Sequence, residues 1–235
     1  AIYLSAAGVA YGDWLQQGED LIQGLSGSHS TKSTLSMDQI ASGLKEALRL
    51  GTETVVNQLG QKGGFATDPA VHIPLPESLE VVKTTLEKVG MGSQLSDLEL
   101  KLNRAAEAAT SKVKPLFWDA IRQMTLKDVN TIYHGPDDAA TQYFRDKMSG
   151  QLTAEMSPII NHSLSQVGAV EAYDEVIAHY RGLPFVLDVK ADLTDHVTTR
   201  TKDGIFHYLA QQEAAIRKDP AKQTTELLKK VFGQD

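Results

Sequence analysis

The chain has 235 residues, of which 41% are hydrophobic and 23% charged, so it is long enough to bury a core and has an ordinary globular composition. Its formal net charge of −7 argues against a nucleic-acid partner, because phosphate binding needs a basic surface. The absence of cysteine excludes a thiol nucleophile and is compatible with any compartment.

Residues 1–12 are apolar, uncharged and rich in small side chains, as at the end of a secretory signal. Ala10 and Gly12 would be the small residues of the cleavage site, so that Asp13 would begin the mature protein. The alternative is a short apolar helix that packs on the folded body, since this stretch is too short to span a bilayer. We therefore expect an exported, periplasmic protein without a transmembrane segment.

Residues 13–36 are expected to precede the folded body. Residues 13–25 have a loose apolar stripe typical of a short helix, which two internal glycines weaken. Residues 26–36 are a Ser/Thr/Gly run with almost nothing to bury, typical of a flexible linker. One helical domain is then expected over residues 37–235.

The first helix of this domain is predicted over residues 37–59. Ser36 and Gln39 match a capping box at its start, and Gly60 supplies a stop after its last apolar residue. The residues expected on its buried face follow helical spacing: Ile40, Leu44, Ala47, Leu48, Val55 and Leu59.

Residues 61–76 contain two adjacent glycines and three prolines, which exclude a helix and favour a long ordered connection. Its apolar residues are expected to lie against the body: Phe65, Val71, Ile73 and Leu75. A helix over residues 77–89 follows and ends at Gly90, and its inward residues are expected to be Leu79, Val82, Leu86 and Val89.

Residues 95–124 form the longest stretch with an apolar face at helical spacing, and we expect them to be the central helical hairpin of the fold. Pro115 removes a backbone donor and is tolerated only in a first helical turn, so the break is expected near residues 112–114. The core face of the first arm is expected to contain Leu95, Leu98, Leu102, Ala105 and Ala109.

Thr125 and Asp128 predict the start of a short helix that ends at Gly135, and Asp137 can cap the next one. The buried side of that helix is expected to contain Ala140, Phe144, Met148 and Leu152. Pro158 is expected to open or kink the helix that ends near Val167.

The remaining segments are also mainly helical. A helix is predicted over residues 169–181, with Val170, Tyr173, Ile177 and Tyr180 inward. Residues 183–189 resemble a strand but have no partner strand, so we expect an extended connection. Residues 192–218 are expected to be helical with a hinge at Asp203 and Gly204, and Pro220 precedes a terminal helix over residues 221–232. The predicted fold is therefore all-α: a single multi-helix, bundle-like domain with a long Gly/Pro-rich connection and no significant sheet.

Several phrases of the sequence resemble one known family, the domain-of-unknown-function family 4197 (DUF4197). They are IASGLKEAL, DPAVHIPLPESL, LELKLNRAAEAA, DDAATQYFR, KDGIFHYLAQQEAAIRKDP and ELLKKVFG, and they are distributed along nearly the whole of residues 35–233. The resemblance implies an exported, mostly helical protein of Gram-negative bacteria, and it brings no established reaction or catalytic residue. Some proteins of this family have a lipid-accepting cysteine near the cleavage site, whereas this chain has none.

The sequence contains few of the residue patterns that are known from catalytic sites. The seven histidines include no HExxH motif and no pair at i, i+4, so neither a metal site nor a cofactor is predicted. Asp192–His196 and Asp203–His207 are carboxylate–histidine pairs that could orient an imidazole, but such pairs are also common on helix surfaces. No serine lies in a GxSxG motif, and residues 60–64 lack the spacing of a phosphate loop.

One polar set is a candidate ligand-binding surface, because charged residues beside core positions are costly unless they are paired. Its members are Asn103, Arg104, Glu107, Asp119, Arg122 and Arg145. The structural alternative is a buried pair or triad that fixes the register of the helices.

Two classes of function follow from these observations. The first is a periplasmic binding or scaffold protein, in which a groove between helices takes an apolar or amphipathic ligand or an envelope protein. The second is an enzyme that uses the Arg/Glu/Asp cluster. A deep pocket lined by Arg104, Glu107 and Arg145 would favour the enzyme, and a groove or exposed patch would favour binding.

Overall fold

The computed structural model describes residues 35–88, 90, 92–178 and 189–233, and the described secondary structure is helical without a strand. The all-α prediction is therefore confirmed. Helices α2 to α10 belong to one compact unit within Met37–Asp235. The short helix and linker expected before residue 35, and the extended connection expected over residues 183–189, lie outside the described residues apart from Val189, which begins a helix.

Helix α2 (Met37–Leu59) has the predicted bounds and buries the predicted face. Residues 61–76 form the predicted ordered connection, which we call the connecting segment. Its four apolar residues are buried as expected: Phe65, Val71, Ile73 and Leu75. Helix α3 (Glu77–Lys88) follows; its Leu79 is buried, and its other predicted inward residues lie outside the described side chains.

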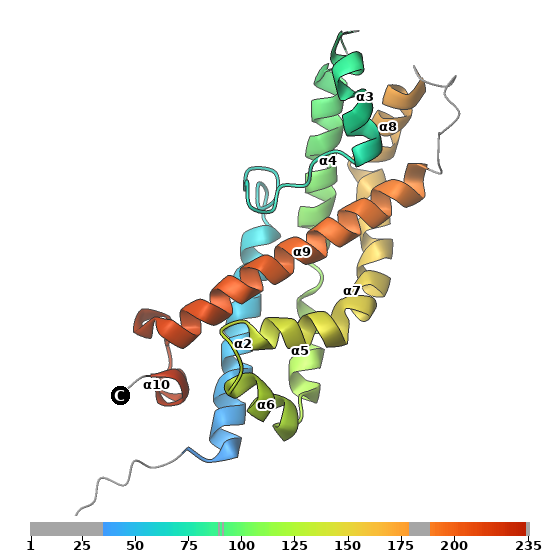
Figure 1. The fold of residues 1–235 in the computed structure, drawn as a ribbon. Helices are drawn as coiled ribbons and strands as arrows, with labels where there is room; N and C mark the ends of the chain where they lie inside the picture. The colour runs from blue at the N-terminus through green and yellow to red at the C-terminus, as the bar shows by residue number, and fades with distance from the viewer. Residues whose placement is uncertain (1–34, 89, 91, 179–188, 234–235) are drawn as a thin grey trace, which may run out of the picture. The chain divides into compact units, whose positions relative to one another are not determined.

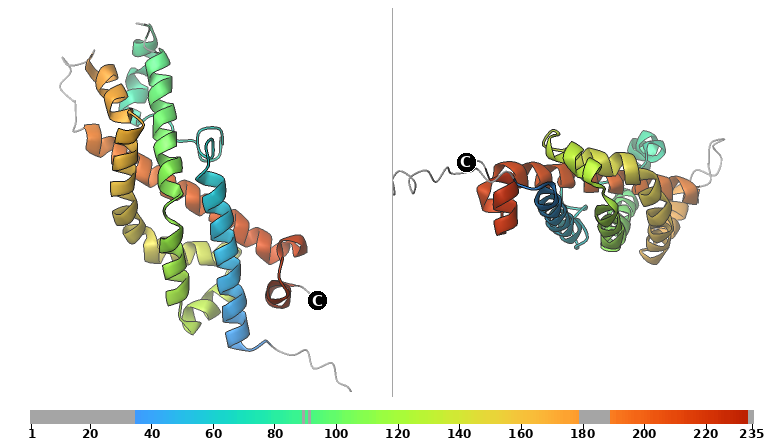
Figure 2. Two further views of the ribbon diagram at one scale, coloured as in Figure 1. Left: turned by 180° about the vertical axis from the view of Figure 1, so that it is seen from behind. Right: turned by 90° about the horizontal axis from the view of Figure 1, so that it is seen from below.

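The predicted hairpin over residues 95–124 is wrong in its geometry. Helices α4 (Gly92–Thr110) and α5 (Lys114–Gln123) are separated near the predicted break, but α5 continues in nearly the same direction as α4 (Figure 2). Val113 keeps a helical backbone conformation, and Val113 and Leu116 donate backbone hydrogen bonds across the break, so the chain does not reverse. Pro115 lies in the first turn of α5, where its missing N–H costs nothing.

Helix α6 (Leu126–Tyr133) begins where Thr125 and Asp128 predicted, and the two residues form a capping box in which each side chain accepts the other's backbone N–H. Helix α7 (Ala139–Gln166) contains Pro158 and buries the predicted face from Ala140 to Leu152. The expected cap is wrong: Asp138, not Asp137, precedes α7, and its side chain makes no capping bond. Asp137 instead pairs with Lys218.

Helix α8 (Ala169–Ala178) buries Tyr173 as predicted, but Val170 and Ile177 are only partly buried. Its buried face is shifted to Ala169, Ala172, Tyr173 and Val176. Helix α9 (Val189–Lys218) is continuous, so the hinge predicted at Gly204 is wrong. Gly204 is buried where Phe65 and Val71 of the connecting segment approach the helix most closely, and this contact explains the glycine.

The chain ends with a short 3-10 helix η1 (Pro220–Lys222) and helix α10 (Glu226–Phe232). The predicted terminal helix therefore begins later than residue 221. Thr225 sets this start, because its hydroxyl accepts a hydrogen bond from the backbone N–H of Leu228.

Helix α9 packs on α2, α4, α7 and α10, and it crosses α2, α4 and α7 obliquely (Figure 1). Helices α2 and α5 pack side by side (Figure 2), and α7 packs on α4, α5 and α9. In the core, Phe117 of α5 meets Phe144 of α7 edge-on, with ring centroids 5.7 Å apart. The connecting segment lies where α4 and α9 meet, so both helices can bind it.

The role of Gly204 can be tested by adding one methyl group. A Cβ at this position would lie 2.9 Å from Phe65 Cε1 and 3.2 Å from Val71 Cβ, and both side chains are buried. We expect Gly204→Ala to lower the free energy of unfolding by about 1–2 kcal/mol, because overpacking outweighs the helix-propensity gain of about 1 kcal/mol. Urea unfolding measures the change.

Gly150 of α7 is the matched control, since nothing lies within 4 Å of a Cβ added there. Gly150→Ala should raise the free energy of unfolding by about 0.5–1 kcal/mol. Equal effects of the two substitutions would contradict the packing role of Gly204.

Candidate functional site

The connecting segment has no regular secondary structure, and Glu107 of α4 binds its backbone directly. Glu107 Oε1 accepts hydrogen bonds from the backbone N–H groups of Gly63, Phe65 and Ala66, at 3.0, 3.2 and 3.2 Å. Its other oxygen accepts a hydrogen bond from Arg104 Nη1 at 2.6 Å. The Glu107 side chain is only 5% exposed, so this carboxylate is buried with its charge and both oxygens satisfied.

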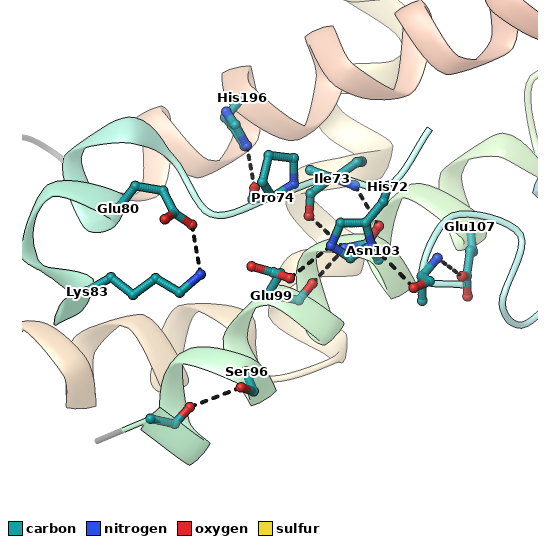
Figure 3. Close-up of polar contacts among 12 residues, drawn as sticks. His72, Ile73, Pro74, Glu80, Lys83, Ser96, Glu99, Asn103, Glu107 and His196 are labelled. Carbon is teal, nitrogen blue, oxygen red and sulfur yellow. Dashed lines mark hydrogen bonds and ion pairs between the residues drawn. The ribbon is translucent and has the colours of Figure 1, made fainter. Parts of the chain in front are cut away.

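Asn103, one turn before Glu107, binds the segment in a second way (Figure 3). Its Oδ1 accepts the N–H of Ile73 at 2.9 Å, and its Nδ2 donates to the carbonyl of Ile73 at 2.8 Å. Nδ2 also donates to the carbonyl of Glu99 at 2.8 Å. The fully buried amide therefore replaces a backbone partner for Ile73, as a neighbouring strand would in a sheet.

Glu99, one further turn back on α4, binds His72 of the segment (Figure 3). His72 Nε2 lies 2.8 Å from Glu99 Oε1, and Nδ1 lies 3.2 Å from the carbonyl oxygen of Ala66. A carboxylate and a carbonyl are both acceptors, so the imidazole satisfies both only when each ring nitrogen carries a proton. Glu99, Asn103 and Glu107 thus form one polar stripe at i, i+4 and i+8, which we call the α4 clamp.

Helix α9 binds the same segment from its other side. His196 Nε2 donates to the carbonyl of Pro74 at 2.9 Å, and the Tyr208 hydroxyl donates to the Asp68 carboxylate. This bond to Asp68, followed by burial, raises the pKa of Tyr208 above its ordinary value. His196 therefore helps to hold the connecting segment in place. The side chain of Asp192, its predicted partner, lies outside the described part of α9.

A second buried ion pair lies on α9, and the sequence reasoning missed it. Glu213 accepts hydrogen bonds from the backbone N–H groups of Ala140 and Thr141, each at 2.9 Å, and so caps the start of α7. Arg217 donates to Glu213 at 2.9 Å and to the carbonyl of Ile132 at 2.9 Å, at the end of α6. The negative Glu213 thus lies at the N-terminus of α7 and the positive Arg217 at the C-terminus of α6, and each charge has the sign that the helix dipole favours. Its i, i+4 Glu–Arg spacing was the available signal in the sequence.

The six predicted site residues do not come together in one pocket. Asn103, Arg104 and Glu107 bind the connecting segment or each other, as described above. Asp119 and Arg122 form an ion pair one turn apart on the surface of α5, with side chains 48% and 73% exposed. Arg145 is exposed on α7, where its guanidinium carbon lies 5.1 Å from the centre of the Phe206 ring.

Arg145 lines an open groove of about 790 Å³ between α7 and α9, which we call the α7–α9 groove. Asp203 and His207, the second carboxylate–histidine pair of the sequence, line it too. His207 Nε2 bonds Gln211 Nε2 at 2.8 Å, so this ring nitrogen is an acceptor for the amide. The groove lining consists of Asp138, Thr141, Gln142, Arg145, Asp203, Phe206, His207, Ala210, Gln211 and Ala214.

Metal and membrane sites receive no support from the part of the chain that the structure describes. Within it, no group of three or more His, Asp or Glu side chains is arranged to hold a metal ion. No described helix is both long and apolar enough to cross a bilayer.

Comparison with known proteins identifies the family. The chain belongs to the family described as proteins of unknown function (DUF4197), whose sequence profile matches residues 34–233. No curated protein and no solved structure matches the chain. The resemblance seen in the sequence phrases is thus confirmed, and it assigns no reaction.

The role of Glu107 predicts a large loss of stability when its charge is removed. Glu107→Gln keeps the size of the side chain, but its NH₂ group is a donor. That group would face either the backbone N–H donors of the connecting segment or the donors of Arg104. We expect the free energy of unfolding to fall by about 3 kcal/mol, as when one partner of a buried ion pair is removed. Chemical denaturation monitored by circular dichroism measures the change.

Asp119→Asn is the matched control, because it removes a carboxylate from an exposed i, i+3 pair. The free energy of unfolding should then change by less than about 0.5 kcal/mol. A Glu107 variant as stable as this control would show that the clamp contributes nothing to folding.

The bond from Tyr208 to Asp68 predicts a pH-dependent contribution to stability. The pKa of Tyr208 is raised in the folded protein, so its contribution is complete below the unfolded pKa of about 10 and is lost as the pH rises through the folded pKa. We expect Tyr208→Phe to lower the free energy of unfolding by about 1 kcal/mol at pH 8.

This difference from the wild type should shrink as the pH rises further above about 10. Denaturation curves of both proteins over this pH range measure the difference. A difference that stays constant through the titration of tyrosine would contradict the bond.

Proposed function

We propose that this protein is a binding or scaffold protein and that its ligand site is the α7–α9 groove. The observation that carries the proposal is Arg145, an exposed arginine that no ion pair joins to any described carboxylate. It lines a groove of about 790 Å³, which is within the range of ligand sites in proteins.

The position of Arg145 suits recognition of a negative group. Its guanidinium is stacked on the face of Phe206, which is only 2% exposed, so the contact restrains the arginine. The guanidinium carries five N–H donors, which suit the binding of an oxyanion. A ligand with a negative group and an apolar part could therefore bond Arg145 while its apolar part lies near Ala210 and Ala214 of the lining.

The other charged candidates are less suited to binding a ligand. Glu107 already accepts four hydrogen bonds, and Arg104 donates to it. Glu213 and Arg217 are likewise occupied with the ends of α7 and α6. Their bonds support a structural role for these groups, whereas Arg145 faces an open groove.

The alternative enzyme would need Arg104, Glu107 and Arg145 in one deep pocket. The bonds of Arg104 and Glu107 to each other and to the connecting segment favour binding over this chemistry. In the groove, the bond between His207 Nε2 and Gln211 occupies the nitrogen that a general base would use.

We further propose that the protein acts in the periplasm on an amphipathic ligand or an envelope protein. The apolar, uncharged stretch of residues 1–12 supports export. Expression with the natural leader and N-terminal sequencing of the periplasmic fraction tests this location, and recovery from the cytoplasm alone would refute it.

The groove can be tested with anilinonaphthalene sulfonate, a fluorescent probe that joins aromatic rings to one anionic group. We expect saturable binding to the folded protein and about tenfold weaker binding to Ala210→Trp, because the indole would occupy part of the groove that Ala210 lines. Arg145→Gln should weaken binding as well, through loss of the charge. Fluorescence titration measures the affinities.

Ala154→Trp is the matched control, since Ala154 is exposed on α7 and does not line the groove. Its affinity for the probe should equal that of the wild type. Equal binding by the wild type and both tryptophan variants would mean that the probe does not bind in the groove and would overturn the proposal.

A further inference from the structure

Two stripes of side chains face each other across the α7–α9 groove. On the α7 side the stripe consists of Asp138, which precedes the helix, and of Thr141, Gln142 and Arg145 in its first two turns. The α9 stripe consists of Asp203, Phe206, His207, Ala210, Gln211 and Ala214. The helices are antiparallel here, because Ala140 bonds Glu213 while Arg145 stacks on Phe206.

The dimensions of the groove fit a helix. The α9 stripe extends over three helical turns, or about 16 Å at 1.5 Å per residue. Ala210 and Ala214 lie one turn apart in this stripe, and their small side chains let another backbone approach closely. Amphipathic helices commonly bind proteins in grooves of this kind, with contacts at intervals of three and four residues.

The lining argues against a purely hydrocarbon ligand. Its apolar members are Phe206, Ala210 and Ala214, and the remaining lining residues are polar or charged. A hydrocarbon chain would remove the charged groups of Asp138, Arg145 and Asp203 from water without supplying an opposite charge, which is unfavourable. A peptide helix brings side chains that can bond them.

The charges along the groove define which helix would fit. Arg145 is positive, and the negative groups are Asp203 on α9 and Asp138, which lies seven residues before Arg145 and about 10 Å away along α7. A helix lying along α7 would place residues seven apart opposite Arg145 and Asp138. Its acidic residue would then face Arg145 and its basic residue would face Asp138.

From this pattern we infer that the occupant of the groove is an amphipathic helix of a partner protein, with an acidic and a basic residue seven positions apart on its groove-facing side. The inference rests on the proposed function, because it names the partner of the same groove. The acidic residue forms a bidentate pair with Arg145. Small residues between the two charges pack on Ala210 and Ala214.

Designed peptides test the inference on the full chain. The probe is a fluorescein-labelled, alanine-rich helix of about 20 residues with one glutamate and one lysine seven apart on one face. A control peptide has the same composition with the lysine moved to the opposite face. We expect the wild type to bind the probe about tenfold more tightly than the control peptide in fluorescence anisotropy.

A charge exchange makes the test specific for Arg145. Arg145→Glu should bind the probe peptide about tenfold more weakly than the wild type does. A second peptide, with lysine in place of the glutamate, should bind Arg145→Glu as tightly as the probe peptide binds the wild type. Arg122→Glu, on the exposed face of α5, should bind as the wild type does. Thermal melts that match the wild type show that the variants are folded.

The possible failures are distinguishable. If the peptides bind without preference or not at all, while anilinonaphthalene sulfonate binding still depends on Ala210, the helix inference is wrong and the proposed function stands. If the Ala210→Trp substitution changes the binding of neither the peptide nor anilinonaphthalene sulfonate, the helix inference and the proposed function are both wrong. Binding of the probe peptide that Arg145→Glu leaves unchanged also overturns the inference.

Discussion

The buried carboxylate of Glu107 is the interaction on which the arrangement of the helices depends. The connecting segment runs between α4 and α9 without regular secondary structure, so its backbone N–H groups are bonded partly by turns within the segment and partly by side chains of α4. One oxygen atom of Glu107 accepts hydrogen bonds from three of these N–H groups. The segment held in this way then contacts α9 at Gly204 and Tyr208, and α4 and α9 are joined through it.

The chain uses its second buried ion pair in a related way. In both places a glutamate accepts backbone N–H groups of another element, and an arginine one turn later or earlier balances the charge. Glu107 serves an irregular segment, whereas Glu213 replaces the cap that Asp138 does not provide to α7. A buried charge is tolerated here because the backbone donors and the arginine satisfy it together.

The sequence predicted the helices well because apolar spacing and caps are local signals, as for α2 and for the capping box at Thr125. It failed where a distant contact decides the local structure. Gly204 was expected to be a hinge, but the close approach of Phe65 explains it, and a residue 139 positions away in the chain leaves no local trace. The candidate site was divided for the same reason: the sequence showed that Arg104 and Glu107 could pair, but not that the connecting segment would cover them.

The two faces of α9 connect these structural bonds with the groove. Tyr208 holds α9 to the connecting segment through Asp68, and His207, the residue before it, lines the α7–α9 groove. Glu213 fixes the same helix to the first turn of α7, which forms the other wall of the groove. Both walls are therefore positioned by buried or partly buried bonds before any ligand arrives. A site arranged in advance loses less conformational entropy on binding, so the buried charged groups that hold the two helices in place also favour binding at Arg145.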